Sequence, residues 1–206
     1  MADYKTIRGI STFEYEEKRS RFLASAAFAD TEQAALEHLS RVRAANRTAR
    51  HNVYAYVLRE GGRMRYSDDG EPAKTAGTPV LEAITHAGLS DVIVVVTRYF
   101  GGILLGTGGL VRAYTAAASG ALQNAELVSM RLIVDCEITV PYGTFEQAQR
   151  LIQAAGGRLE EPVYADAVTL RWKMPSGTEE SLCRSLQELT RGTASVRTGT
   201  PRYAAF

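Results

Sequence analysis

The chain has 206 residues, with 24 Lys and Arg against 23 Asp and Glu, which gives a formal net charge of +1. So small a net charge excludes a protein that coats nucleic acid through bulk charge, and any such contact must be local. The sequence contains no apolar run long enough to cross a membrane and opens without the apolar stretch of a secretory signal. We therefore expect a cytoplasmic protein with no membrane partner.

The cysteines and histidines predict neither a bound metal nor a cofactor. Cys136 and Cys183 are isolated from each other, and His38, His51 and His86 form no metal-binding pair. Two unpaired thiols are the expected outcome. Folding should then need neither a disulfide nor a metal ion.

The first half of the sequence alternates strand and helix patterns. Residues 3–28 predict two or three strands, and a helix should follow Asp30, which forms a capping-box pattern with Gln33. A polar loop is expected at 68–77. The remaining expected elements are strands at 52–59 and 63–67, a helix from Pro79 to the Gly88 region, a buried strand at 92–96 and a helix at 109–124.

The second half predicts a strand–helix–strand–strand–helix–strand order. Its first strand is expected at 131–140, its helices at 144–155 and 177–190, and its last strand at 193–198. That order is the ferredoxin-like βαββαβ pattern. We therefore predict an α+β protein of two abutting domains, residues 1–127 and residues 128–206.

Several blocks of the first half resemble the YigZ/IMPACT family. Any one block is weakly specific, whereas the same four in this order over about 100 residues are highly specific. In the second half the resemblance rests on the βαββαβ order and on Pro141-Tyr142. The four blocks are residues 17–22, 49–56, 67–72 with 75–79, and 97–102 with 106–114.

The resemblance implies a first domain with the fold shared by a small-subunit ribosomal protein, domain IV of elongation factor G and small-molecule kinases. It implies a second domain similar to domain V of elongation factor G. Eukaryotic members regulate translation during amino-acid starvation with an additional N-terminal module, for which this sequence shows no counterpart. The expected partners are therefore RNA, the ribosome or a translation-related protein, by analogy of fold.

An acidic loop gives the first candidate site. Asp68, Asp69 and Glu71 place three carboxylates within four residues. Such oxygens suit a hard cation such as Mg²⁺, although the spacing is not that of an EF-hand. The alternative is a solvated turn, because Asp and Gly are common turn residues.

A glycine-rich segment after a buried strand gives the second candidate site. Arg98 is expected at the end of that strand, before glycines that lead into a helix, and such an arrangement suits a phosphate group. Neither the Walker pattern nor the dinucleotide fingerprint is present. The alternative is that the glycines serve turns and close packing. The glycines concerned are Gly101, Gly102, Gly106, Gly108 and Gly109.

His51 is the candidate acid or base if it faces the acidic loop, and a structural histidine otherwise. Tyr54 and Thr75 complete the predicted ligand-binding set. A further alternative concerns a concentration of arginines that predicts either a solvated helix end or a local binding surface. These arginines are Arg41, Arg43, Arg47 and Arg50.

The leading hypothesis is an RNA- or ribosome-associated protein that modulates translation through a local Arg and Gly surface. The alternatives are an enzyme acting on a phosphorylated small molecule or nucleotide, and a protein-interaction module. The sequence contains no catalytic triad or nucleophile elbow and does not decide whether the protein is an enzyme. Convergence of His51, Asp69, Glu71 and Arg98 in one cleft would favour the enzyme, and a flat basic face would favour RNA.

Overall fold

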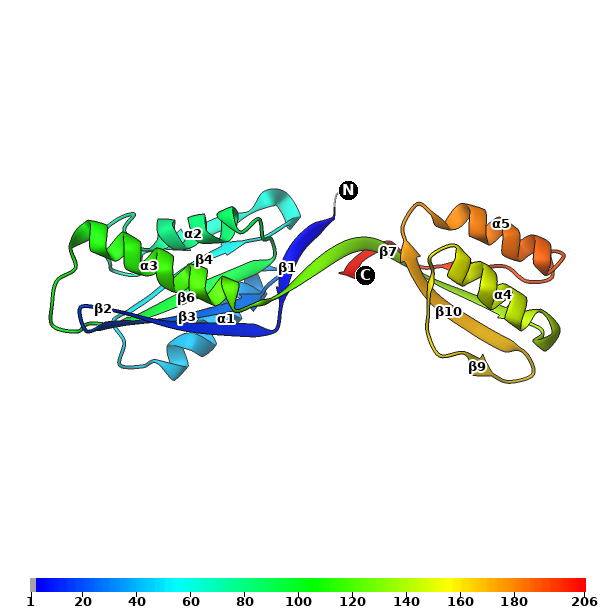
Figure 1. Cartoon of the computed structure of the whole chain (residues 1–206), viewed down its shortest axis with the longest axis horizontal. Coiled ribbons are helices and arrows are strands. Elements are labelled where there is room, and N and C mark those ends of the chain that lie inside the picture. Colours follow the sequence, from blue (N-terminus) through cyan, green and yellow to red (C-terminus); the bar gives the residue numbers. More distant parts are fainter. Residues whose placement is uncertain (1–2) are drawn as a thin grey trace. The chain divides into compact units, whose positions relative to one another are not determined.

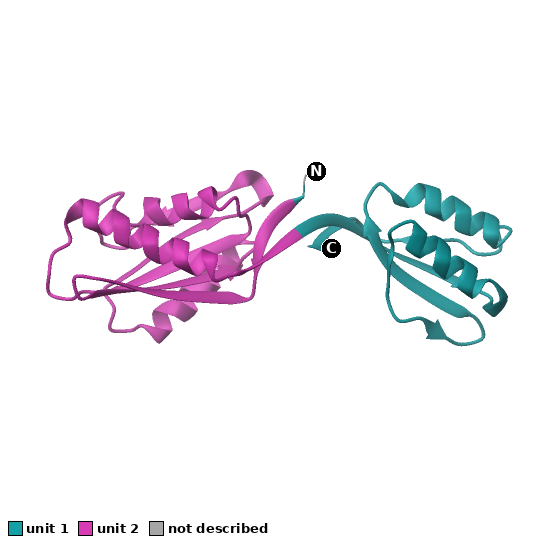
Figure 2. Ribbon diagram, viewed as in Figure 1, with its two compact units in different colours: residues 1–3, 130–206 teal, residues 4–129 magenta. Residues whose placement is uncertain are grey.

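The structure, a computed structural model, describes residues 3–206. The chain divides into two compact units (Figure 2). The first unit contains residues 4–129, and the second joins Asp3 to residues 130–206. The division falls inside one long strand, β7 (Glu126–Val140), to which β1 (Tyr4–Arg8) is hydrogen-bonded.

The first unit is built on a five-stranded antiparallel sheet with the strand order β2-β3-β6-β4-β5. The central strand β6 contains the β-branched run at 92–96 from which it was predicted. The strands of this sheet are, in that order, β2 (Ile10–Glu17), β3 (Ser20–Phe28), β6 (Val92–Tyr99), β4 (His51–Val57) and β5 (Met64–Ser67). A short 3-10 turn, η1 (Glu60–Gly62), connects β4 to β5.

Helices cover both faces of this sheet (Figure 1). The helices α2 (Gly77–His86) and α3 (Gly106–Gln123) pack with Val92, Val94 and Val96 of β6. The helix α1 (Glu32–Ala45) packs on the opposite face with Ile93 and Val95. Because successive side chains of a strand point to opposite faces, β6 is buried on both sides.

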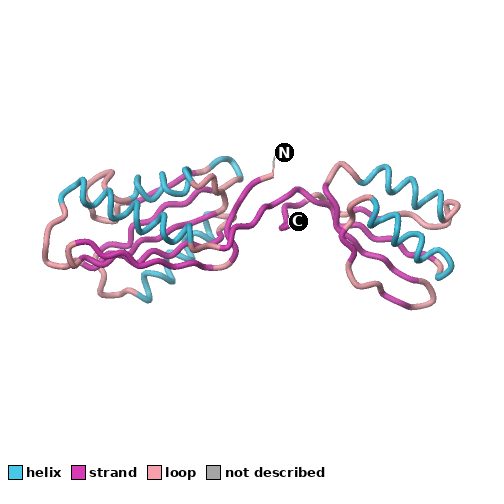
Figure 3. Tube along the Cα trace, in the orientation of Figure 1, coloured by secondary structure: helices cyan, strands magenta, loops and turns pink. Residues whose placement is uncertain are grey.

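The second unit has its helices on one face of a sheet (Figure 3). Its core combines inward residues of β7 and β10 with Ala148 and Ile152 of α4 and with Leu182 and Leu186 of α5. The unit thus has a core of its own. Its other elements are α4 (Tyr142–Ala154), β8 (Arg158–Leu159), β9 (Val163–Tyr164), β10 (Val168–Pro175), α5 (Glu179–Leu189), β11 (Arg197–Thr198) and β12 (Arg202–Ala205).

The two cysteines are unpaired thiols of this second unit. Cys136 is buried, and burial raises its pKa to about 12. Burial also raises the pKa of Cys183. Neither thiol is therefore activated as a nucleophile at neutral pH.

Three expected element boundaries were wrong. The helix α1 is capped by Thr31, whose side chain accepts from the N–H of Ala34, and not by Asp30. The helix α3 begins at Gly106, so part of the expected glycine loop is helical. The expected last strand at 193–198 is only Arg197–Thr198, and β12 follows it.

Within residues 3–206, no helix combines the length and the apolar character needed to span a bilayer.

Candidate functional site

Asp68, the first carboxylate of the acidic loop, caps α2. Its Oδ1 accepts from the backbone N–H of Ala76 (3.1 Å) and of Gly77 (2.8 Å), and its Oδ2 accepts from the N–H of Lys74 (2.9 Å). A carboxylate at this position also interacts favourably with the helix dipole. The side chain of Asp68 therefore fixes the start of α2.

Asp69 connects the loop to α1 and β4. Its Oδ1 accepts from the Arg43 guanidinium (2.8 Å), and its Oδ2 accepts from the backbone N–H of Asn52 (2.6 Å). Its φ of 44° lies in the left-handed region, which costs energy in any residue with a side chain. These hydrogen bonds hold the backbone in that conformation.

Glu71 forms the buried centre of the site. Its Oε1 accepts from the Arg98 guanidinium (2.7 Å) and from the hydroxyl of Tyr114 in α3 (2.8 Å). The side chains of Glu71 and Arg98 are only 4% and 8% exposed. Burial, followed by the negative charge of Glu71, raises the pKa of Tyr114, so its phenol stays protonated.

All three carboxylates thus hold groups of the protein. Among residues 3–206, no group of three His, Cys, Asp or Glu side chains is arranged to hold a metal ion. The alternative in which Asp68, Asp69 and Glu71 coordinate a cation has no support in this geometry. The loop contains a hydrogen-bonded turn, and its three carboxylates bind backbone and side-chain groups of the first unit.

His51 begins β4 and lies opposite Arg98 of β6 in the sheet register. Its Nδ1 is 2.9 Å from the backbone oxygen of Asp69. Because a carbonyl oxygen only accepts, Nδ1 carries the proton in the neutral ring. The other nitrogen, Nε2, is then a hydrogen-bond acceptor.

A pocket of about 650 Å³ lies beside His51 and Arg98. We name it the Arg98 pocket. Its walls come from the segment before β4, the end of β6 and the glycine-rich loop. The lining residues are Thr48, Ala49, Arg50, His51, Arg98, Tyr99, Phe100 and Leu104.

The Arg98 pocket carries excess positive charge. Arg98 is 7% exposed, and its Nε is a buried donor with no acceptor in the described chain. The Arg98 guanidinium carbon lies 5.6 Å from the ring centroids of both Phe22 and Phe100. Arg50 is exposed and forms no ion pair within residues 3–206. An unpaired buried donor costs about 1–3 kcal/mol, which an anionic ligand could recover.

The glycines have separate roles. A Cβ on Gly101 would overlap the backbone carbonyl of Arg19, so Gly101 permits close contact between the loop and the β2–β3 turn. Gly106 has a φ of +69° at the start of α3. The first turn of α3, which contains Gly108 and Gly109, has no side-chain cap. Gly102, with a φ of +85°, has open space around its Cβ position.

The remaining predicted residues lie elsewhere. Tyr54 is buried with Tyr56 on the α1 face of the sheet, and the Thr75 hydroxyl donates to the carbonyl of Pro72. His51, Asp69, Glu71 and Arg98 are neighbours, but only His51 and Arg98 line the pocket. The predicted set lacked Arg50 and Phe100. Arg50 directly precedes His51, and Phe100 lies two residues after Arg98. These positions were the signals in the sequence that could have identified them.

Comparison with protein families finds two separate matches along the chain. Residues 18–122 match the Impact N-terminal domain, and residues 138–193 match a domain of unknown function, DUF1949. The first match covers the whole acidic loop and the Arg98 pocket. The second lies within the second unit.

The chain also resembles whole proteins over most of their length. It is 43% identical over 176 residues to "IMPACT family member in pol 5'region" of Thermus thermophilus, covering 85% of this chain and 96% of that protein. It is 33% identical over 184 residues to "IMPACT family member YigZ" of Escherichia coli K12, covering 88% and 90%. A crystal structure titled as a hypothetical protein matches with a TM-score of 0.66 at 31% identity, covering 95% of this chain and 97% of that one. With family blocks, domain matches and full-length relatives in agreement, this chain belongs to the IMPACT family.

Proposed function

We propose that this IMPACT family protein acts in the cytoplasm as an RNA- or ribosome-associated modulator of translation, and that it holds single-stranded RNA in the Arg98 pocket. The observation that carries the proposal is the buried, unpaired Nε of Arg98 beside the free cation of Arg50. A phosphate group would supply a negative charge for Arg50 and a hydrogen-bond acceptor for the Nε of Arg98.

The pocket also offers contacts to a base and a sugar. Phe100 is 56% exposed, which leaves its ring accessible for stacking on a nucleobase. The Nε2 of His51 is an acceptor for a ribose 2′-hydroxyl. That hydroxyl distinguishes RNA from DNA, so we expect the site to prefer RNA.

RNA binding is favoured over an enzyme acting on a phosphorylated small molecule. Such an enzyme would need a free carboxylate or another acid–base partner for His51. Asp68, Asp69 and Glu71 are instead engaged with backbone N–H groups, arginines and Tyr114. His51 and Arg98 therefore suit binding better than catalysis.

The test is Arg50→Gln, because Arg50 is exposed and its loss should leave the fold intact. Fluorescence anisotropy with a labelled single-stranded RNA should show weaker binding by about 1.5–3 kcal/mol. The slope of log affinity against log salt should fall by about 0.7, the single-strand value for one phosphate contact.

The matched control is Arg63→Gln, an exposed cation next to η1, at the other end of β4 from His51. It should bind RNA as the unchanged protein does. If the two substitutions weaken RNA binding equally, the binding depends on general surface charge and not on the Arg98 pocket. A DNA strand of the same sequence that binds as tightly as RNA would contradict the role given to His51.

A further inference from the structure

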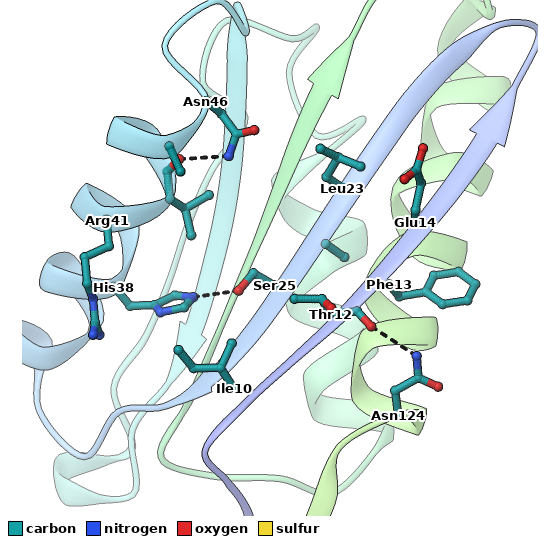
Figure 4. A pocket seen from close by; sticks show the side chains of 13 residues that line it. Ile10, Thr12, Phe13, Glu14, Leu23, Ser25, His38, Arg41, Asn46 and Asn124 are labelled. Carbon is teal, nitrogen blue, oxygen red and sulfur yellow. Dashed lines mark hydrogen bonds between the residues drawn. The ribbon is translucent and has the colours of Figure 1, made fainter.

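A second hollow of about 620 Å³ lies between α1 and the strands β2 and β3 (Figure 4). It shares no lining residue with the Arg98 pocket. We name it the His38 groove. Its walls are largely apolar, with Ile10 and Leu23 from the strands and Val42 and Ala45 from α1. His38 and Arg41 of α1 and its C-cap residue Asn46 supply the polar side chains on the helix side.

His38 is a buried side chain whose hydrogen bonding is incomplete. It is 3% exposed, and its Nε2 lies 3.1 Å from the Ser25 hydroxyl. A dashed line marks this contact in Figure 4. Its Nδ1 has no partner within residues 3–206. Burial, together with the charge of Arg41, lowers the pKa of His38, so the ring is neutral at pH 7. Because the Ser25 hydroxyl can donate or accept, this contact fits either tautomer of His38, and in the tautomer whose Nε2 accepts from Ser25, Nδ1 is an N–H without an acceptor in the described chain.

Arg41 lies three residues after His38 and therefore on the same side of α1. It is exposed and has no ion-pair partner among residues 3–206. Glu14 lines the groove from β2, where it is paired with Arg21. Among the described residues, the groove thus has one free cation, one buried ring nitrogen without a partner, and apolar side chains from α1, β2 and β3.

These features select one class of ligand. A bare cation lacks ligands here, because the neutral His38 is the only imidazole and Glu14 is already paired. A nucleic acid would bring several phosphates toward a single arginine and a glutamate. An acid with one carboxylate and an apolar body matches both the polar groups and the walls.

We propose that the His38 groove binds a small carboxylic acid with an apolar tail. Its carboxylate pairs with Arg41 and selects the tautomer of His38 that carries the proton on Nδ1, and its tail lies along Leu23, Val42 and Ala45. This site is separate from the proposed RNA site. It would make the protein responsive to a small apolar acid whether or not RNA is its partner.

The test uses octanoate as the probe and the full chain at pH 7. Calorimetry and amide NMR should show saturable binding, with shifts concentrated on α1, β2 and β3. Arg41→Gln should weaken binding about tenfold or more, the scale of one charge-assisted contact. Ala45→Trp, at an exposed position, should abolish binding by filling the groove.

Two controls separate the site from apolar adsorption. Arg47→Gln removes an exposed arginine that does not line the groove and should bind octanoate within twofold of the unchanged protein. Octanol has the same tail without the carboxylate and should bind at least about tenfold more weakly. The NMR titration of His38 should move to higher pH when octanoate is bound, since a carboxylate favours the charged ring.

Absence of saturable octanoate binding at millimolar concentration would overturn the proposal, as would equal binding by Arg41→Gln and by octanol. Loss of RNA binding in Arg50→Gln leaves this outcome unaffected, so the two proposals fail independently.

Discussion

Glu71 and Arg98 form a buried ion pair, with 2.7 Å between Oε1 and the guanidinium nitrogen, at the place where the acidic loop meets the end of β6. Arg98 is thus paired within the protein. The pair positions the guanidinium of Arg98, which lines the Arg98 pocket and whose buried Nε has no acceptor in the described chain. Arg98 therefore has a structural role, and its removal cannot serve as a clean test of binding.

The first prediction is that Glu71→Gln destabilises the protein by about 3–5 kcal/mol, because it leaves the Arg98 charge buried without its partner. Urea unfolding measures the change. The double variant Glu71→Leu with Arg98→Met should recover most of the loss, since apolar groups of similar size can replace a buried pair. The matched comparison is Glu180→Gln, which breaks the exposed pair with Arg184. If Glu71→Gln lowers the free energy of unfolding no more than Glu180→Gln does, this account is contradicted.

The second prediction concerns acid sensitivity through His38. Its pKa is lower in the folded chain than the value of about 6.5 expected after unfolding. The contribution of the neutral ring to stability is therefore complete above that value and is lost as the pH falls below it. The loss approaches about 1.4 kcal/mol per pH unit until the folded-state pKa is reached.

His38→Gln removes this proton and should give a flatter stability curve between pH 7.5 and pH 5. The groups facing His38 are the Ser25 hydroxyl and the Arg41 guanidinium, neither of which titrates in that interval. Parallel curves for the two proteins would show that His38 binds its proton equally in both states.

The third prediction is that Asp68→Ala costs about 0.5–2 kcal/mol, the usual effect of losing a helix cap. Amide exchange should accelerate first at Ala76 and Gly77, whose N–H groups lose their acceptor. Added Mg²⁺ should not raise the melting temperature of the unchanged protein. A Mg²⁺-dependent rise that disappears in Asp68→Ala would restore the loop as a cation site.

The fourth prediction is that residues 130–206 fold alone as a separable domain. Their core of β7, β10, α4 and α5 residues is contained within that segment. The isolated fragment should unfold cooperatively and give a dispersed amide spectrum. A fragment without a cooperative transition would show that the two units depend on each other for stability.

Local patterns in the sequence predicted most elements, because strand alternation and helical stripes are local signals. The apolar run at 92–96 predicted β6. The pattern at 144–155 predicted α4, whose ends differ from the predicted ends by one or two residues. The start of α3 was missed because Gly106 to Gly109 have poor helix propensity. Tertiary contacts overrode that propensity.

The site could be predicted only as a set of candidates. Arg98 and His51 were found because both stand in family blocks, but the partners of each carboxylate lie far along the chain. Glu71 is 27 residues from Arg98 and 43 from Tyr114. No local pattern reports such pairing, so the sequence left a cation site and a solvated turn as the two alternatives for the acidic loop. The His38 groove was not predicted at all, since its walls come from α1 and two strands.

The three carboxylates of the acidic loop have a consequence for the kinetics of folding. Asp68 holds α2, Asp69 holds α1 and β4, and Glu71 holds β6 and α3. The contacts of Asp69 and Glu71 join residues 17 to 43 positions apart in the chain, so they should be largely absent from the transition state. Weakening any of them should then accelerate unfolding while leaving the folding rate nearly unchanged. The acidic loop would then determine the unfolding rate of the first unit.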